Sequence, residues 1–393
     1  MNTRPVIESS YAPVVLSASF NQDASCFAVG LETGFCIYNS EPCKLNNLRD
    51  FNAGIGAVAM VGRTNMIALI GGGRQPKFAQ NKVVIWDDSK QGVVMTIPVL
   101  TAVRAVRISR SHIIVALQNS VRVYKFQTTP ELAASYETAD NPYGLCCLGT
   151  QHLAIPGITP GQVRLVELAT GNVSIVPAHS SPLRALEISQ DGEVLATASQ
   201  TGTLIRVFAI PSFARLAELR RGVDHATIFS LAIAPAGQLL AVTSDKSTLH
   251  IFDIPHPSKL ARTESVNGNR ALTSQTSGVA PPPGDTDTSQ KWGILGRLPL
   301  LPRVFSDTYS FASAHFEIGD EPVYGGSTPL NSPGDSGFRP PKGVIGWTSD
   351  NTLLLIGGGR DARWERFVIA DGEDGKRYCV RDGWKRYHGS AKR

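Results

Sequence analysis

The 393-residue chain lacks several features that identify membrane-spanning proteins and common enzymes. No run approaches the ~20 consecutive apolar residues that a helix needs to cross a bilayer. The first twenty residues also lack a basic segment followed by a continuous apolar one, so we expect no secretory signal. The chain has no G-x-S-x-G motif, and neither of its I-G-G-G-R stretches, at 70–74 and 356–360, continues into the G-K-[ST] of a phosphate-binding loop. We therefore expect no catalysis.

Cysteine is sparse and is not arranged for metal binding. The six cysteines form no C-x-x-C pair and have no histidines at the spacing of zinc ligands, so we expect no metal site. We interpret them as reduced, mostly buried thiols, which favours a cytoplasmic protein. The formal net charge of +5 is small for this length; it permits an anionic partner without requiring one.

A repeated pattern of short β-branched runs, separated by Gly, Asp, Asn or Ser turns, recurs roughly every forty residues. The clearest unit, residues 183–222, contains four such runs, as expected for the four strands of a propeller blade. A second unit follows it directly at 226–254. Similar units begin near Val15, Ala57, Val103, Gly144 and Lys342. The pattern predicts an all-β fold, with residues 1–393 forming a single seven-bladed β-propeller.

Two segments interrupt the repeats. Residues 255–290 are rich in Pro, Ser, Thr and Gly and lead into a stretch of large apolar residues among a few cations. We interpret 255–310 as one long flexible loop within the sixth blade, with a tip that meets an apolar surface. Residues 319–341 are expected to be a disordered insertion before the seventh blade. The basic end of the chain, 381–393, is expected to fray into solvent.

Two consecutive arginines, in the sequence Leu219-Arg220-Arg221-Gly222, end the fifth repeat. We expect them on its fourth and outermost strand. Neighbouring side chains in a strand point to opposite faces, so the two arginines should serve two separate pockets at the rim. Hydroxyl, imidazole and cationic groups that suit a phosphate surround both positions in the fifth and sixth repeats. The alternative is that these are solvated surface charges and ordinary turn residues.

The Leu-Arg-Arg-Gly sequence resembles the hallmark of the PROPPIN family, the β-propellers that bind polyphosphoinositides, and the pattern is closest to its shorter WIPI- and Hsv-like branch. Residues 69–88, 196–208, 244–252 and 301–316 also resemble segments of that family. The resemblance implies binding of phosphatidylinositol 3-phosphate and phosphatidylinositol 3,5-bisphosphate at two rim sites. The implied first site comprises His179, Ser199, Thr201, Thr203, Arg206 and Arg220. The implied second site comprises Arg221, Thr227, Ser244, Lys246, Thr248 and His250.

The resemblance also implies how such a protein meets membranes and partners. The loop would insert shallowly, because Pro299 and Pro302 interrupt a long helix. Its inserting residues would be Trp292, Leu295, Leu298, Leu301 and Phe305. Asn21 and Asp23 are candidates for contacting a lipid-transfer protein of autophagy, with a plain β-turn as the alternative.

The resemblance further implies a setting inside the cell. We expect a monomeric cytoplasmic protein, without cofactor or nucleic-acid partner, that lies peripherally on the phagophore assembly site and on endosomal and vacuolar membranes. A rival interpretation from the residues alone is a WD-type scaffold that binds only proteins.

Overall fold

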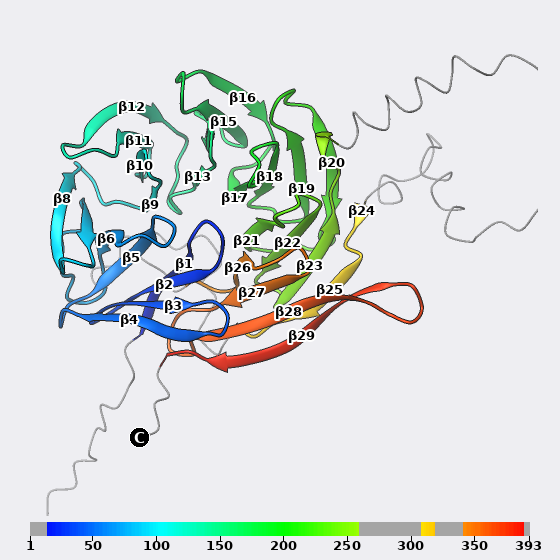
Figure 1. The fold of residues 1–393 in the computed structure, drawn as a ribbon. Helices are drawn as coiled ribbons and strands as arrows, with labels where there is room; N and C mark the ends of the chain where they lie inside the picture. Colours follow the sequence, from blue (N-terminus) through cyan, green and yellow to red (C-terminus); the bar gives the residue numbers. More distant parts are fainter. Residues whose placement is uncertain (1–13, 259–307, 319–340, 389–393) are drawn as a thin grey trace, which may run out of the picture.

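The computed structural model describes residues 14–258, 308–318 and 341–388. Seven sheets surround a common centre and together contain every described strand (Figure 1). The first strands of neighbouring sheets contact one another all the way around the ring, including β26 (Val344–Trp347) with β1 (Val15–Phe20). The predicted seven-bladed β-propeller is therefore confirmed. We number the blades one to seven in chain order.

The strands follow the predicted repeats closely. Those of blades one to four are β1, β2 (Cys26–Leu31), β3 (Gly34–Asn39), β4 (Lys44–Asp50), β5 (Ile55–Met60), β6 (Met66–Gly71), β7 (Lys82–Asp87), β8 (Gly92–Pro98), β9 (Ala105–Ile108), β10 (His112–Ala116), β11 (Ser120–Lys125), β12 (Glu131–Glu137), β13 (Cys147–Leu148), β14 (His152–Pro156), β15 (Gln162–Glu167) and β16 (Val173–Pro177). Those of blades five to seven are β17 (Leu183–Ile188), β18 (Val194–Ser199), β19 (Leu204–Ala209), β20 (Arg215–Arg220), β21 (Ile228–Ile233), β22 (Leu239–Ser244), β23 (Thr248–Asp253), β24 (Thr308–Tyr309), β25 (Ala312–His315), β26, β27 (Thr352–Ile356), β28 (Arg363–Asp371) and β29 (Arg377–Arg386).

Burial changes from the inner to the outer strands of a blade, and the amino-acid sequence follows it. Each middle strand packs against two neighbouring blades, so β18 and β22 are buried along their whole length. Outer strands such as β4 are mostly exposed, and their sequences are correspondingly polar. A glycine at a positive φ, such as Gly192 at 78° or Gly237 at 71°, allows the tight turn between the first two strands of its blade. All six cysteines are free, and four of them are buried.

The ring closes by packing of blade one against blade seven. Val15 and Gly359 exchange two backbone hydrogen bonds, of 3.1 and 2.8 Å. The aromatic rings of Phe27, Tyr38 and Tyr387 pack together across the same junction, with centroids 5.0–5.2 Å apart. Within the described residues, blades one and seven exchange no strand.

Two expectations from the sequence need correction. The basic end of the chain does not fray from residue 381, because β29 continues to Arg386 as the outer strand of blade seven. The ring of Tyr387, packed against blade one, anchors the end of that strand. The strand that carries the double arginine is also not the outermost in its sheet, because β24 pairs in parallel with β20 at Leu219 and Arg220.

Candidate functional site: the rim between blades five and six

Strand β20 sends its last side chains to alternate faces of blade five. Leu219 is fully buried in the apolar cluster between blades five and six, beside Ile228 and Phe252. Because side chains alternate along a strand, Glu218 and Arg220 face the blade-four side. Their partners on β19 are Arg206 and Leu204. Arg221, which directly follows the strand, is close enough to the side chains of blade six to lower the pKa of His250.

The Arg221 side chain is nearly buried, with 8% of its surface exposed. Its Nε donates a 2.7 Å hydrogen bond to the Gly202 carbonyl, and Nη2 donates to the Asp224 carbonyl. Within the described residues, Nη1 donates to no acceptor. Burial lowers the pKa of the guanidinium, and the nearby charges of Asp245 and Asp224 oppose this effect. One edge of the guanidinium therefore fixes the side chain and the other remains available.

On the other face, Arg206 is engaged by an acid that the sequence analysis did not single out. Its Nε lies 2.8 Å from Glu218 Oε2, and its Nη1 donates a 2.5 Å hydrogen bond to the Ala178 carbonyl. Arg215 reaches the same carboxylate oxygen at 3.1 Å. Arg206 is thus neutralised by Glu218 on the face where Arg220 lies.

The remaining members of the predicted first site are engaged in contacts within blade five. Ser199 Oγ lies 2.8 Å from Thr201 Oγ1, and His179 Nε2 lies 3.0 Å from Thr197 Oγ1. Burial, followed by the nearby charge of Arg206, lowers the pKa of His179 to about 4, so the imidazole is neutral near pH 7. Thr203 is half-buried, and its carbonyl accepts the Arg221 N–H at 3.0 Å.

The predicted second site surrounds the turn between β22 and β23. Ser244 is fully buried there, whereas Lys246 is exposed. Thr248 Oγ1 is buried without a hydrogen-bond partner in the described structure. His250 Nδ1 lies 3.0 Å from Ser310 Oγ, and burial, followed by the charge of Arg221, lowers the pKa of His250 to about 4. Thr227 completes the set; its carbonyl accepts the Asp245 N–H at 3.0 Å.

Three residues at this rim were missed from the sequence. Glu218 stands two residues before Arg220, and Asp245 stands between Ser244 and Lys246, so a search for acids near the cationic residues would have found both. Ser310 gave no comparable signal, because it reaches His250 from a distant part of the chain.

Both described ends of the predicted loop contact blade five. At the start, His256 Nε2 lies 2.7 Å from Asp191 Oδ2, in the turn between β17 and β18. At the end, β24 pairs with β20. The end of the loop therefore re-enters the ring beside the double arginine. Its start contacts the other end of the blade-five strands, because the turn at Asp191 precedes Val194, which pairs with Ala209, whereas Arg220 pairs with Leu204. The predicted inserting residues, Trp292, Leu295, Leu298, Leu301 and Phe305, lie outside the described residues, as does 319–340 of the second predicted insertion.

The two candidate partner-binding residues differ in accessibility. Asn21 is 5% exposed; its Oδ1 accepts the Cys26 N–H at 3.0 Å, and its Nδ2 lies 3.0 Å from Ser25 Oγ. Asp23 is exposed, with its Oδ1 2.6 Å from Ser25 Oγ. Only Asp23 presents its side chain at the surface, so Asn21 serves the turn itself.

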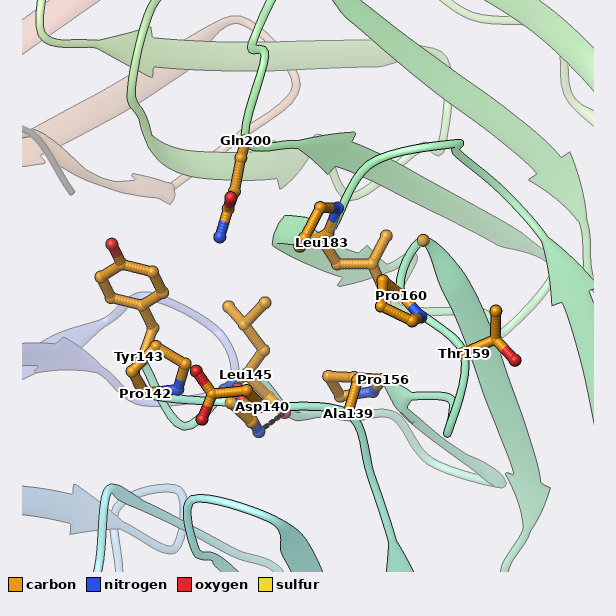
Figure 2. A pocket seen from close by; sticks show the side chains of 13 residues that line it. Ala139, Asp140, Pro142, Tyr143, Leu145, Pro156, Thr159, Pro160, Leu183 and Gln200 are labelled. Atoms are coloured by element: carbon orange, nitrogen blue, oxygen red, sulfur yellow. Dashed lines mark hydrogen bonds between the residues drawn. The ribbon is translucent and has the colours of Figure 1, made fainter. Parts of the chain in front are cut away.

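Two cavities formed by the described residues do not coincide with the predicted sites. One, between blades four and five, has a volume of about 10 Å³ and is lined by Tyr143, Leu183 and Gln200, among others (Figure 2). A small-molecule pocket typically has about 300–1,000 Å³. The other, of about 470 Å³, lies between β25 and β29, where Arg377 is already paired with Asp253.

The described residues include no group of three or more His, Cys, Asp or Glu side chains placed to hold a metal ion. No helix within the described ranges is long and apolar enough to cross a membrane.

The fold defines a seven-bladed β-propeller, with its candidate site on an open rim between two blades. The family model for PROPPIN matches residues 14–268. The chain therefore belongs to the PROPPIN family, phosphoinositide-binding propellers associated with autophagy.

Known relatives cover nearly all of the chain. It is 58% identical to SVP1-like protein 2 of Emericella nidulans over 334 residues, which span 84% of this chain and 99% of that protein. It is 47% identical to SVP1-like protein 2 of Neurospora crassa, with 99% of both chains covered. A solved structure of Kluyveromyces lactis Hsv2 has a TM-score of 0.71 at 23% identity, covering 96% of this chain and all of that one. That structural likeness shows the shared fold.

Proposed function

We propose that the rim between blades five and six binds the headgroups of phosphatidylinositol 3-phosphate and phosphatidylinositol 3,5-bisphosphate at two sites. The observation that supports this proposal is the burial of Leu219 between blades five and six, from which strand alternation directs Arg220 to the blade-four face, while the charge of Arg221 acts on His250 of blade six. The two sites keep the residues assigned from the sequence, and the protein acts by binding rather than by catalysis.

The chemistry of each site suits a phosphate monoester, which carries a charge of about −1.5 to −2 at pH 7. A guanidinium binds such a group with two parallel N–H donors, and Arg221 Nη1 is available for this role. Lys246 adds a second, exposed cation, and neutral His250 can supply one N–H donor. At the first site, the phosphate must compete with Glu218 for Arg206.

Two weak sites on one edge, with an apolar loop between them, favour binding to a membrane over binding to free headgroups. Once one site holds a lipid, the next contact is intramolecular, which can raise avidity by about 10²–10⁴. The end of the loop is attached to blade five at Arg220, so its tip would enter the bilayer close to the double arginine. The disc would stand edge-on, with both flat faces accessible to proteins.

We further propose that the protein acts on the phagophore assembly site and on endosomal and vacuolar membranes, where it recruits an autophagy lipid-transfer protein through the surface around Asp23. A structural neighbour, the complex of KlAtg21 with the coiled coil of AgAtg16, has a TM-score of 0.63 at 18% identity and covers 95% of this chain. A coiled coil is thus a second kind of partner to test.

Liposome co-sedimentation tests the proposal. Vesicles containing each inositide isomer in turn should sediment the wild-type protein only when a 3-phosphate is present. Arg220→Thr/Arg221→Thr should abolish sedimentation, whereas Arg74→Thr/Arg110→Thr, which removes two exposed arginines elsewhere, should not. Retained binding by a folded Arg220→Thr/Arg221→Thr protein would reject the rim sites and favour a protein-binding scaffold.

A further inference from the structure

Asp245 has an unusual position for a carboxylate, because it lies in a site proposed to bind anions. It stands between Ser244 and Lys246 in the turn that joins β22 to β23. Its charge acts on the guanidinium of Arg221, yet no ion pair within 4.0 Å joins the two groups. Asp245 is therefore near enough for its charge to act on Arg221, without direct contact between the two groups.

The carboxylate also makes no hydrogen bond within the described structure. Oδ1 is inaccessible to solvent and has no donor, and Oδ2 accepts from no described residue. Buried polar atoms are nearly always paired, because leaving one without a partner costs about 1–3 kcal/mol. Oδ2 is not closed off in this way, so a donor from outside the chain can reach the carboxylate through this oxygen.

Other turn aspartates of this protein show what a structural role looks like. Asp23, Asp87, Asp191 and Asp374 each accept the backbone N–H two residues further on, at 3.0–3.1 Å. This local bond is the usual reason for aspartate in a turn. The turn at Asp245 is closed without its carboxylate, because the Ser247 N–H donates to the Ser244 carbonyl at 3.2 Å. The carboxylate of Asp245 is thus not needed to close its own turn.

A guanidinium with a free N–H edge and a separate carboxylate without a donor match a polyol phosphate. The phosphate accepts from Arg221 and Lys246, and a ring hydroxyl donates to the carboxylate, which can only accept. A plain phosphate would gain nothing from Asp245 and would be repelled by its charge. The pair therefore distinguishes a phosphorylated ring with free hydroxyls from other anions.

We propose that Asp245 is the residue of the second site that accepts a hydrogen bond from a hydroxyl of the inositol ring. This inference rests on the proposed function of the same site. It makes Asp245 a specificity residue: Arg221 and Lys246 supply charge, and Asp245 recognises the sugar alcohol.

The test compares two soluble ligands by isothermal titration calorimetry in an Arg220→Ala background, which leaves only the second site. The ligands are inositol 1,3-bisphosphate and 1,3-propanediol bisphosphate, which has two phosphates and no hydroxyl. Asp245→Ala should weaken binding of the inositol ligand about tenfold or more relative to the propanediol ligand. Asp245→Asn, which keeps one acceptor oxygen, should fall in between.

Asp224→Ala is the matched control, because Asp224 is exposed and its charge also acts on Arg221. It should change the affinities of both ligands by the same factor. The inference is rejected if Asp245→Ala also changes the affinities of both ligands by the same factor. This holds whether binding tightens because repulsion is lost or weakens because the turn is disturbed. Failure of the Arg220→Ala protein to bind inositol 1,3-bisphosphate would instead reject the proposed second site.

Discussion

Arg220 and Tyr309 are paired neighbours on the parallel strands β20 and β24, although the first three strands of blade six lie between them in the sequence. This pairing attaches the end of the long loop to the strand that carries the double arginine. The next residue, Ser310, contacts His250 of the proposed second site at 3.0 Å. A single short segment therefore touches elements of both proposed sites.

If this attachment positions the loop, breaking it should weaken binding to membranes more than binding to soluble headgroups. Tyr309→Pro removes a backbone N–H and restricts the chain, so it should release β24 from β20. We expect liposome binding to weaken several-fold, with little change in affinity for inositol 1,3-bisphosphate. Tyr309→Ala, which keeps the backbone, is the control. Equal losses for liposomes and soluble headgroup would show that β24 supports the sites rather than the loop.

The loop tip is proposed to contribute apolar insertion. Replacing Leu298, Leu301 and Phe305 with Ser removes side chains that each contribute about 1.5–3 kcal/mol when fully buried in an apolar phase. Because the proposed insertion is shallow, we expect at least a tenfold loss in liposome binding and no change in titration with soluble headgroup. Identical losses in the two assays would exclude a wedge role.

The two candidate partner residues should behave differently. Asp23→Ala removes an exposed carboxylate and should reduce co-purification of the lipid-transfer protein while sparing lipid binding. Asn21→Ala removes buried hydrogen bonds and should lower the free energy of unfolding by about 1–3 kcal/mol, measured by chemical denaturation. An unchanged pull-down with Asp23→Ala would remove this surface from the proposal.

Stability should decline in mild acid because of the two rim histidines. The pKa values of His179 and His250 are about 4 in the folded protein, and the ordinary value is about 6.5. Between these values the unfolded chain binds protons that the folded chain does not, so stability falls as pH decreases from about 6.5 to 4. Each histidine contributes up to roughly 3 kcal/mol to this loss.

Thermal unfolding between pH 7.5 and 4.5 measures the effect. The Tm of His179→Gln/His250→Gln should fall less steeply with acid than that of the wild type. His225→Gln, which changes an exposed histidine on the same rim, should follow the wild type. Parallel curves for all three proteins would contradict the assigned role of the buried imidazoles.

The propeller could be predicted because its evidence is local. Each blade is a run of consecutive hairpins, so turn residues and β-branched runs mark it within about forty residues. The seven predicted starting points all fall within or a few residues before a first strand. The separation of Arg220 and Arg221 follows from strand alternation alone, and the burial of Leu219 supports it.

Other features depend on contacts between distant segments and could not be read locally. The two-residue strand β24 has too few residues to show a pattern, and its partner is β20 in the preceding blade. The sequence of β29 is rich in charge because one side of this outer strand is solvated, and it was therefore mistaken for a tail. Glu218 could not be assigned to the site from the sequence, because a carboxylate repels the anion that the site is expected to bind.

The central claim is that Arg220 and Arg221 serve two separate headgroup sites, and counting bound headgroups tests it most directly. Isothermal titration with inositol 1,3-bisphosphate should give a stoichiometry of about two for the wild type, about one for Arg220→Ala or Arg221→Ala, and none for the double variant, if each guanidinium is the main cation of its own site. A wild-type stoichiometry of one, abolished by either single substitution, would contradict the account.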